Sequence, residues 1–255
     1  FWAESLGRGP NRVTVGDWDG INLSSLASAR VRSGIRSWEV DRLHVKDTGQ
    51  TFDLLEQAVY SAGCRGAERV FLRAPYDSEL VDAARKVGFF PYYTEAHLAG
   101  LGELTNTKVT GFSVEHRTPA DLQGLFQLYC AATPQEVRQG IGMTIDQWKD
   151  SQEPAQTQRY ESILKLNGKI VGWRMCEPFG KSTAGQTLGH PEHPDSTRYL
   201  VDISCQTQNW LVPNYQQNVS ELLEQQGLQE VGRYTMLIKT VSVPVRSRDY
   251  SYVEA

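Results

Sequence analysis

The stretch WEVDRLHVKDTGQTFDLLEQAVYSAGCRGAERVFLRAPYDSELVDAARKVGFF, residues 38–90, decides the fold. Residues 38–45 alternate and are rich in β-formers, and residues 68–75 are mostly apolar, so both predict strands. A helix is predicted over residues 52–66, and a second over residues 77–89 begins at an Asp/Ser cap and ends at a glycine. The apolar face of the first helix consists of Phe52, Leu55, Val59 and Ala62. Two strands joined by a crossover helix are expected to lie parallel in one sheet.

The turn between the first strand and the first helix reads Lys46-x-x-Gly49-x-Thr51, and the second helix ends in KVGF. With the order strand, turn, helix, strand, helix, this pattern resembles the GNAT superfamily of acetyl-CoA-dependent N-acetyltransferases. In that family the turn usually reads Gln/Arg-x-x-Gly-x-Gly/Ala and binds the pyrophosphate of the cofactor, because orphan N–H groups and the helix dipole favour anions. The resemblance implies acetyl-CoA, or a related acyl-CoA, as the cofactor. The implied contacts are Leu43, Val45, Lys46, Gly49, Gln50 and Thr51.

The sequence around this stretch completes a first unit. Residues 12–20 and 26–34 predict two strands that form an antiparallel meander with the strand just described. In the GNAT pattern these are the second, third and fourth strands. The first strand and the two opening helices of the family have no room between residue 1 and Arg12, so either they lie upstream of residue 1 or this unit is a shortened copy that lacks its opening. Residues 91–100 predict its last strand, and the polar residues 102–110 predict a linker.

A second unit follows the linker. Residues 119–133 predict a helix capped by Thr118, and residues 160–178 predict a hairpin around Asn167-Gly168. The other expected elements are a strand at 112–118, a helix at 144–152, a strand within 180–191, a helix at 194–207 capped by Asp195 or Ser196, a strand at 209–216, a helix from 217 that Gly227 ends, and a strand or strand pair up to 243.

This element order is again that of the GNAT family. We therefore expect an α/β fold made of two tandem GNAT-like units, residues 1–104 and 109–255, each a mixed, twisted sheet flanked by helices.

Two carboxylates of the first unit are candidate general bases for the deprotonation of an amine acceptor. Glu39 and Asp41 are two residues apart on the first strand, so they share a face, and the family often keeps its general base on this strand. The alternative is a solvated strand face, or ion pairs with Arg30, Arg32 or Arg42. In many family members a Tyr near the end of the second helix acts as the general acid, but Ala84 occupies that position.

The corresponding turn of the second unit reads GHPEHPDST, residues 189–197. Its two prolines remove N–H donors, and Glu192 and Asp195 oppose an anion. His190 and His193 form either a base or metal pair, or an ordinary His-Pro loop, and no third ligand with metal-like spacing lies nearby. We therefore expect no metal site.

The composition narrows the class of protein. The net charge of −4 and the pI near 5.8 give no reason to expect nucleic-acid binding, and no apolar run approaches the length of a membrane helix. The 4 cysteines are scattered without a CxxC pair, which predicts reduced thiols in a cytoplasmic protein.

Two functions remain open at this stage. One is a GNAT-type acyltransferase that moves an acetyl or acyl group from acetyl-CoA to an amine, carried by a small molecule or a peptide. The other is a catalytically inactive GNAT-like protein that acts as a binding or assembly module, which the degenerate motifs favour. Pairing of sheet edges in a homo-oligomer, or with a protein partner, is a further expectation.

Overall fold

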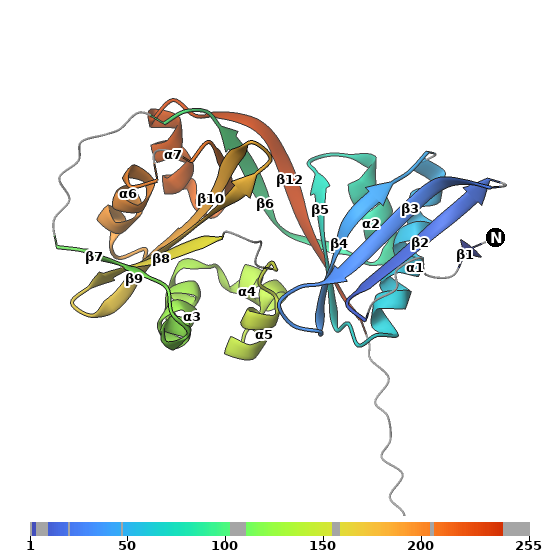
Figure 1. The fold of residues 1–255 in the computed structure, drawn as a ribbon, viewed down its shortest axis with the longest axis horizontal. Helices are drawn as coiled ribbons and strands as arrows, with labels where there is room; N and C mark the ends of the chain where they lie inside the picture. The colour runs from blue at the N-terminus through green and yellow to red at the C-terminus, as the bar shows by residue number, and fades with distance from the viewer. Residues whose placement is uncertain are drawn as a thin grey trace, which may run out of the picture.

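One continuous sheet runs through the whole molecule, with helices on both of its faces (Figure 1). The computed structural model describes residues 2–3, 10–19, 21–46, 48–102, 111–154, 159–204 and 207–241. Within these residues the sheet has 12 strands in the order β1-β2-β3-β4-β5-β12-β6-β11-β10-β9-β8-β7. The predicted α/β class with mixed sheets and flanking helices is confirmed, and the structure adds that the sheets of the two halves are joined.

The N-terminal half follows the predicted order closely. Its first elements are β1 (Trp2–Ala3), β2 (Arg12–Asp19), β3 (Asn22–Val31), β4 (Ser37–His44), η1 (Thr48–Gln50), α1 (Thr51–Gly63), β5 (Arg69–Pro75) and α2 (Glu79–Val87). Strands β2, β3 and β4 form the predicted antiparallel meander, and β4 pairs with β5 in parallel, as the crossover helix requires. Helix α2 ends at Gly88, whose φ of +97° is the left-handed conformation that glycine adopts without strain.

The C-terminal half also matches the predicted order. Its first elements are β7 (Ser113–His116), η2 (Pro119–Asp121), α3 (Leu122–Ala132), α4 (Gln135–Ile141), α5 (Ile145–Asp150), β8 (Tyr160–Leu166), β9 (Lys169–Phe179), β10 (Ser182–Gly189), α6 (Pro194–Asp202), β11 (Asn209–Pro213) and α7 (Gln217–Gln225). The predicted hairpin turns at Asn167 and Gly168, whose φ values of +50° and +78° are those of a type I′ turn.

The predicted cap of α6 was wrong. This helix begins at Pro194, and His193 is its N-cap, because proline is favoured at the first helical position. The hydroxyl of Ser196 does not cap the helix but donates to the carbonyl oxygens of His193 and Val171, at 2.6 Å and 3.1 Å.

The two halves exchange their last strands at the centre of the sheet. Strand β6 (Phe90–Ala99) follows α2 along the chain, yet it pairs with β11 of the C-terminal half. Strand β12 (Gln229–Thr240) comes from the C-terminal half, yet it lies between β5 and β6. The halves are therefore held together by main-chain hydrogen bonds along both exchanged strands.

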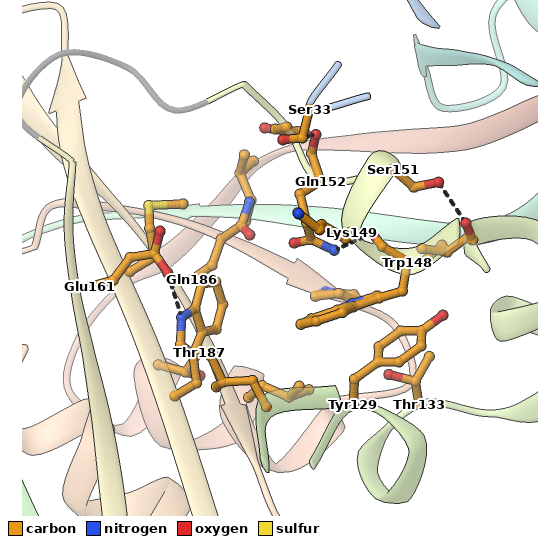
Figure 2. A pocket seen from close by; sticks show the side chains of 18 of the residues that line it. Ser33, Tyr129, Thr133, Trp148, Lys149, Ser151, Gln152, Glu161, Gln186 and Thr187 are labelled. Carbon is orange, nitrogen blue, oxygen red and sulfur yellow. Dashed lines mark hydrogen bonds between the residues drawn. The ribbon is translucent and has the colours of Figure 1, made fainter. Parts of the chain in front are cut away.

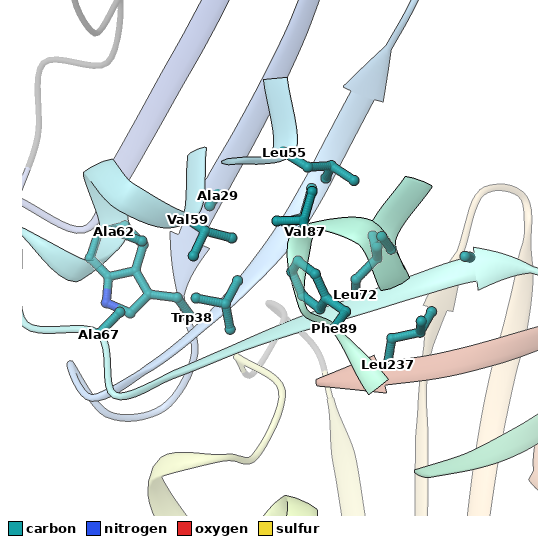
Figure 3. Close-up of a cluster of buried hydrophobic side chains, with 14 of the residues drawn as sticks. Ala29, Trp38, Leu55, Val59, Ala62, Ala67, Leu72, Val87, Phe89 and Leu237 are labelled. Atoms are coloured by element: carbon teal, nitrogen blue, oxygen red, sulfur yellow. The ribbon is translucent and has the colours of Figure 1, made fainter. Parts of the chain in front are cut away.

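Helices α1, α2, α6 and α7 cover one face of the sheet, and α3, α4 and α5 cover part of the other (Figure 1). The largest core lies under α1 and α2, where Trp38 is 1% exposed and packs near Ala62 and Ala67 (Figure 3). Leu237, on the exchanged strand β12, completes this core and is fully buried.

Some predictions fall outside what the structure describes or tests. Residues 103–110 of the predicted linker and Cys205 lie outside the described residues, and the domain limits 1–104 and 109–255 stay a prediction. None of the helices in the described ranges has both the length and the apolar character needed to cross a bilayer.

Candidate functional site

The main pocket lies on the C-terminal half, between its sheet and helices α3 to α5. It has a volume of about 340 Å³ and is lined by residues of β6, β8 to β11 and the three helices. Arg32 and Arg73 of the N-terminal half also line it. This volume is in the range of small-molecule sites, and both halves of the chain contribute to the walls.

The helical wall is aromatic. The rings of Tyr129 on α3 and Trp148 on α5 are stacked, with 5.4 Å between centroids and an angle of 28° (Figure 2). The hydroxyl of Tyr129 donates to the carbonyl oxygen of Gly142 at 3.2 Å, which fixes the ring. On the opposite wall, Glu161 accepts a hydrogen bond of 3.0 Å from Trp173 Nε1 (Figure 2). The pocket therefore offers flat apolar surfaces to a planar or aliphatic group.

The sheet wall opens where two parallel strands separate. Strands β10 and β11 pair only through Ala184 with Asn209 and Gly185 with Trp210. Beyond these pairs the strands diverge, and the residues that follow on both strands line the pocket. They are Gln186, Thr187 and Leu188 on β10 and Leu211 and Pro213 on β11. Facing edges of strands that do not pair with each other are able to hydrogen-bond an extended ligand, as an added strand does.

Charged side chains form the end of the pocket nearest the N-terminal half. Glu153 Oε1 lies 2.9 Å from Arg73 Nη2 and 3.4 Å from Arg32 Nη2. Glu95 is 3% exposed, and its Oε2 lies 3.1 Å from Arg73 Nε in an ion pair. The geometry of this contact is not that of a hydrogen bond, and neither atom has another hydrogen-bond partner.

The two carboxyl groups have opposite pKa shifts. Burial raises the pKa of Glu95, and the nearby Arg73 only partly offsets it. Burial also acts against the charged form of Glu153, but Arg73, Arg32 and Arg159 outweigh it, so the pKa of Glu153 is lowered. Glu95 is therefore the pocket carboxyl that more readily holds a proton.

Tyrosine side chains cluster beside these charges. The ring centroids of Tyr92 and Tyr93 are 4.7 Å apart, and those of Tyr93 and Tyr215 are 5.7 Å apart. Burial raises the pKa of all three hydroxyls, so they stay protonated near neutral pH and act as donors.

The predicted catalytic pair lies outside this pocket, on the face of the N-terminal sheet that α1 and α2 leave uncovered. Glu39 lies 2.6 Å from Arg30 and 3.0 Å from Arg32, and Asp41 lies 2.8 Å from Arg12. The structure thus shows the ion pairs that the sequence left as the alternative. The proposed role of Glu39 or Asp41 as a base stays a prediction.

The predicted cofactor turn of the N-terminal half is held by side chains of the chain itself. The hydroxyl of Ser25 accepts the N–H of Lys46 at 3.0 Å and donates to Gln50 Oε1 at 2.7 Å. Gln50 Nε2 in turn donates to Asp17 Oδ2 at 2.7 Å, while Gly49 lies exposed in η1. The N–H of Lys46 is therefore already engaged, and the carboxylate of Asp17 is connected to this turn through Gln50.

The remaining predicted cofactor contacts face the protein interior. Leu43 and Val45 pack into the core beneath α1, and Thr51, 6% exposed, is the first residue of that helix. The structure brings the six predicted residues together at one turn, as expected, but does not connect them to the pocket.

Comparison with known proteins gives the fold. The sequence matches no protein-family model and no curated protein. Among solved structures, a GCN5-related N-acetyltransferase from Sphaerobacter thermophilus superposes with a TM-score of 0.54 at 14% identity, over 92% of this chain and 82% of that chain. A tandem GNAT protein from the clavulanic acid biosynthesis pathway gives 0.51 at 12%, over 90% and 82%. A GCN5-related N-acetyltransferase from Kribbella flavida gives 0.52 at 10%, over 94% and 90%.

The chain has the GNAT fold. At these identities the likeness concerns the fold, so the fit of an acyl-CoA has to be judged on the residues present. In a GNAT fold the turn after the fourth strand is the place for the diphosphate, and here that turn exists twice. The N-terminal copy is the turn in which Ser25 already occupies the N–H of Lys46.

The C-terminal copy of this GNAT turn is also poor in free donors. Pro191 and Pro194 have no N–H group, and the N–H of His193 donates to the carbonyl oxygen of His190 at 2.9 Å. The N–H of Glu192 points to His190 Nδ1 at 3.3 Å. Among the described residues, the C-terminal turn therefore has two prolines and two engaged N–H groups, and the N-terminal turn has one engaged N–H group.

The histidines of the same turn do not form a metal site. The ring centroids of His190 and His193 are 5.2 Å apart, but nowhere in the described ranges do three or more His, Cys, Asp or Glu side chains group as metal ligands.

Sequence reasoning missed the pocket because its residues are far apart in the chain and individually ordinary. Glu95 sits on a strand that the sequence predicts correctly, but its burial follows from the exchange with β12. Glu153 follows the predicted helix at α5 and carries no motif. The one usable signal was the strong helix pair α3 and α5, whose aromatic residues line the pocket.

Proposed function

We propose that this chain is a GNAT-fold protein that binds a small organic ligand in the pocket of its C-terminal half and does not turn over acyl-CoA. One observation carries the proposal. Both turns that would hold the cofactor diphosphate have lost donors: Ser25 engages one N–H group of the N-terminal turn, and prolines and an internal hydrogen bond remove donors from the C-terminal turn. The pocket under α3 to α5, in contrast, is lined by side chains of both halves.

The energetic argument concerns the diphosphate. Anion binding at such a turn depends on N–H groups that the helix leaves unpaired and on the positive end of the helix dipole. At these turns some donors are absent or already engaged, and Asp17 or Glu192 lies nearby. A diphosphate that binds there loses its water and gains too few hydrogen bonds from the turn to compensate for that loss. The aromatic and polar walls of the pocket suit a small organic ligand that carries no diphosphate.

The test is calorimetric titration of the purified chain with acetyl-CoA, repeated with Gly49→Glu. We expect no saturable heat from either protein. Binding that disappears in Gly49→Glu would contradict the proposal and place a working cofactor site in the N-terminal half. Binding that survives this substitution would contradict it as well and place the site in the C-terminal half.

A second candidate is acyl transfer to an amine, and one specific observation favours it. The gap between β10 and β11 opens into the same pocket as the buried carboxyl of Glu95. A carboxyl whose pKa is raised by burial is suited to take a proton from an amine held in that pocket.

This second function has its own test. The purified chain is incubated with acetyl-CoA and a panel of amines, and the release of free thiol is followed over time. Turnover that Glu95→Gln abolishes and Glu39→Gln leaves intact would establish acyl transfer in the C-terminal half. Turnover lost in Glu39→Gln alone would move the chemistry to the N-terminal half.

A further inference from the structure

The charged end of the pocket contains a carboxylate of the chain in a place suited to a carboxylate of a ligand. Glu153 reaches Arg32 and Arg73 through one and the same oxygen, Oε1. The two arginines come from the N-terminal half, one just after β3 and one on β5, whereas Glu153 comes from the segment after α5. Residues far apart in the chain thus converge to hold one carboxyl oxygen at the pocket wall.

The contact uses only part of what Arg73 offers. A guanidinium binds a carboxylate best through two parallel N–H···O bonds. Arg73 donates Nη2 to Glu153, but its Nε has no hydrogen-bond partner, because Glu95 Oε2 lies at 3.1 Å outside the required angle. Arg73 therefore makes one hydrogen bond to Glu153 through Nη2, while its Nε is in an ion pair with Glu95 that is not a hydrogen bond.

The contact is also open to exchange. The side chains of Glu153 and Arg73 are 30% and 31% exposed, and both line the pocket. The backbone of Glu153 is held separately, since Arg159 Nη1 donates to its carbonyl oxygen at 3.3 Å. The carboxylate of Glu153 can therefore leave the arginines while its main chain stays in place.

We propose that the pocket ligand is a small organic carboxylate, whose carboxylate replaces that of Glu153 on Arg73 and Arg32 and whose apolar body lies against Tyr129 and Trp148. This inference rests on the proposed function, because it names the ligand class of the same pocket. Glu153 then acts as an internal competitor: it keeps the arginines paired in the free protein and weakens every carboxylate ligand by the free energy of its own contact.

The balance of charges supports an exchange over simple addition. Arg32 already faces Glu39, Arg73 faces Glu95, and Arg159 faces Glu177. A ligand carboxylate added beside Glu153 would place a further negative charge among these acids, whereas a ligand that displaces Glu153 leaves the local charge unchanged.

The experiment compares phenylacetate with its neutral isostere phenylacetamide, titrated calorimetrically into the full chain and into Glu153→Gln. We expect phenylacetate to bind Glu153→Gln about tenfold more tightly than the wild type, a difference of about 1.4 kcal/mol. Phenylacetamide should gain nothing from the substitution. Adding Arg73→Met to Glu153→Gln should remove the gain.

The matched control is Asp150→Asn. This variant also replaces a carboxylate by its amide, three residues before Glu153. Asp150 pairs with Arg36 and does not line the pocket, so the variant should bind phenylacetate with the wild-type affinity. Thermal unfolding of each variant checks that it is folded.

Three outcomes would overturn the inference: equal phenylacetate affinity in wild type and Glu153→Gln, an equal gain for phenylacetamide, or no phenylacetate binding to any variant. The same samples titrated with acetyl-CoA test the proposed function separately. If acetyl-CoA binds and phenylacetate still gains affinity in Glu153→Gln, the proposed function is refuted and the carboxylate site is kept. If acetyl-CoA does not bind and phenylacetate gains no affinity, the proposed function is kept and the carboxylate site is refuted.

Discussion

The two halves of this molecule share one sheet, but the pocket described above lies against the C-terminal half, with only a few residues of the N-terminal half at its end. The same face of the sheet carries Glu39 and Asp41 in the N-terminal half and Glu95 in the C-terminal half. In the C-terminal half α3 to α5 cover that face and enclose a volume of about 340 Å³. In the described part of the N-terminal half, only the two-residue strand β1 precedes β2, and arginines pair with the carboxylates instead.

This difference shows, for the described residues, what a covering layer of helices contributes. A sheet face with acidic side chains becomes either a pocket, if a second layer of helices covers it, or a row of ion pairs, if it stays open. The catalytic prediction for Glu39 and Asp41 rested on the strand alone, and the strand pattern is the same in both situations. The covering layer therefore decides which half is able to hold a ligand.

The largest expected effect tests whether the halves are separable at all. Leu237 belongs to the C-terminal chain segment but is fully buried in the core of the N-terminal half. Leu237→Ala should lower the free energy of unfolding by about 2–5 kcal/mol. Because β12 lies between β5 and β6, we expect one cooperative urea transition, with equal loss of amide protection in both halves.

The control for this prediction is Val231→Ala on the same strand. Val231 is 60% exposed, so its truncation should change stability by less than about 0.5 kcal/mol. Two separate transitions in Leu237→Ala, with the C-terminal amides unaffected, would show that the halves fold independently despite the exchanged strands.

The exchange itself could not be predicted from the sequence. Local patterns place β6 within one residue and predict a strand or strand pair where β12 lies, and the crossover rule places β4 beside β5, because these features depend on neighbours in the chain. Whether the last strand of a unit returns to its own sheet or enters the other is not a local property. Both arrangements bury the same alternating side chains and satisfy the same main-chain groups.

The next effect concerns the turn of the N-terminal half. Ser25 is fully buried, and its hydroxyl serves both Lys46 and Gln50. Ser25→Ala leaves the partly buried N–H of Lys46 and Oε1 of Gln50 without this partner, so we expect a loss of about 1 kcal/mol in the free energy of unfolding. The neighbouring Ser24→Ala, whose hydroxyl donates only to Asp17, should cost less in the same urea titration. Equal losses would mean that the Ser25 contacts do not hold the turn.

The third prediction uses the two pocket carboxyls, which share Arg73 but shift in opposite directions. The pKa of Glu153 is lowered in the folded protein, so its ionised carboxylate stabilises the fold at pH values above the unfolded pKa of about 4.3. This contribution to stability is lost as the pH falls through the folded pKa. Glu153→Gln should therefore cost about 1.5 kcal/mol at pH 7 and progressively less towards acid pH.

Glu95 should show the opposite dependence. Its pKa is raised, so its stabilisation is present below the unfolded pKa and is lost as the pH rises through its folded pKa. The free energy of unfolding of Glu95→Gln, relative to that of the wild type, should therefore be lowest in acid and should rise with the pH. Unfolding titrations of both variants from about pH 2 to pH 7 cover the window of Glu153 below about pH 4.3 and that of Glu95 above it, and slopes of equal sign would refute the assignment.

The sequence also shows why the site was harder to predict than the fold. The cofactor turn of the N-terminal half was found because its residues are contiguous, and they do lie together around η1. The pocket combines residues from 32 to 216, and its charged end exists only because Arg32 and Arg73 meet the segment after α5. Such a meeting depends on the docking of the halves, which no periodicity encodes.

The smallest expected effect concerns that docking. Arg36 and Asp150 form an ion pair of 2.8 Å between the halves, but their side chains are 47% and 21% exposed. Asp150→Asn should change the free energy of unfolding by at most about 1 kcal/mol, and less at high salt. The main-chain bonds from Ser33 to Gln152 and from Gly34 to Asp150, both 3.1 Å, remain in this variant.

Gly34→Ala is the sharper version of the same test. A Cβ atom at Gly34 would lie 2.1 Å from Asp150 Oδ1 and 2.7 Å from Asp150 Cβ, so the side chain of Asp150 has to move and the segment after α5 is pushed away. If docking holds Arg32 and Arg73 at the pocket wall, Gly34→Ala should weaken phenylacetate binding, because it moves these arginines away from the helical wall of the pocket, while Asp150→Asn should not. Equal behaviour of the two variants would mean that the pocket is built by the C-terminal half alone and that the arginines of the other half merely border it.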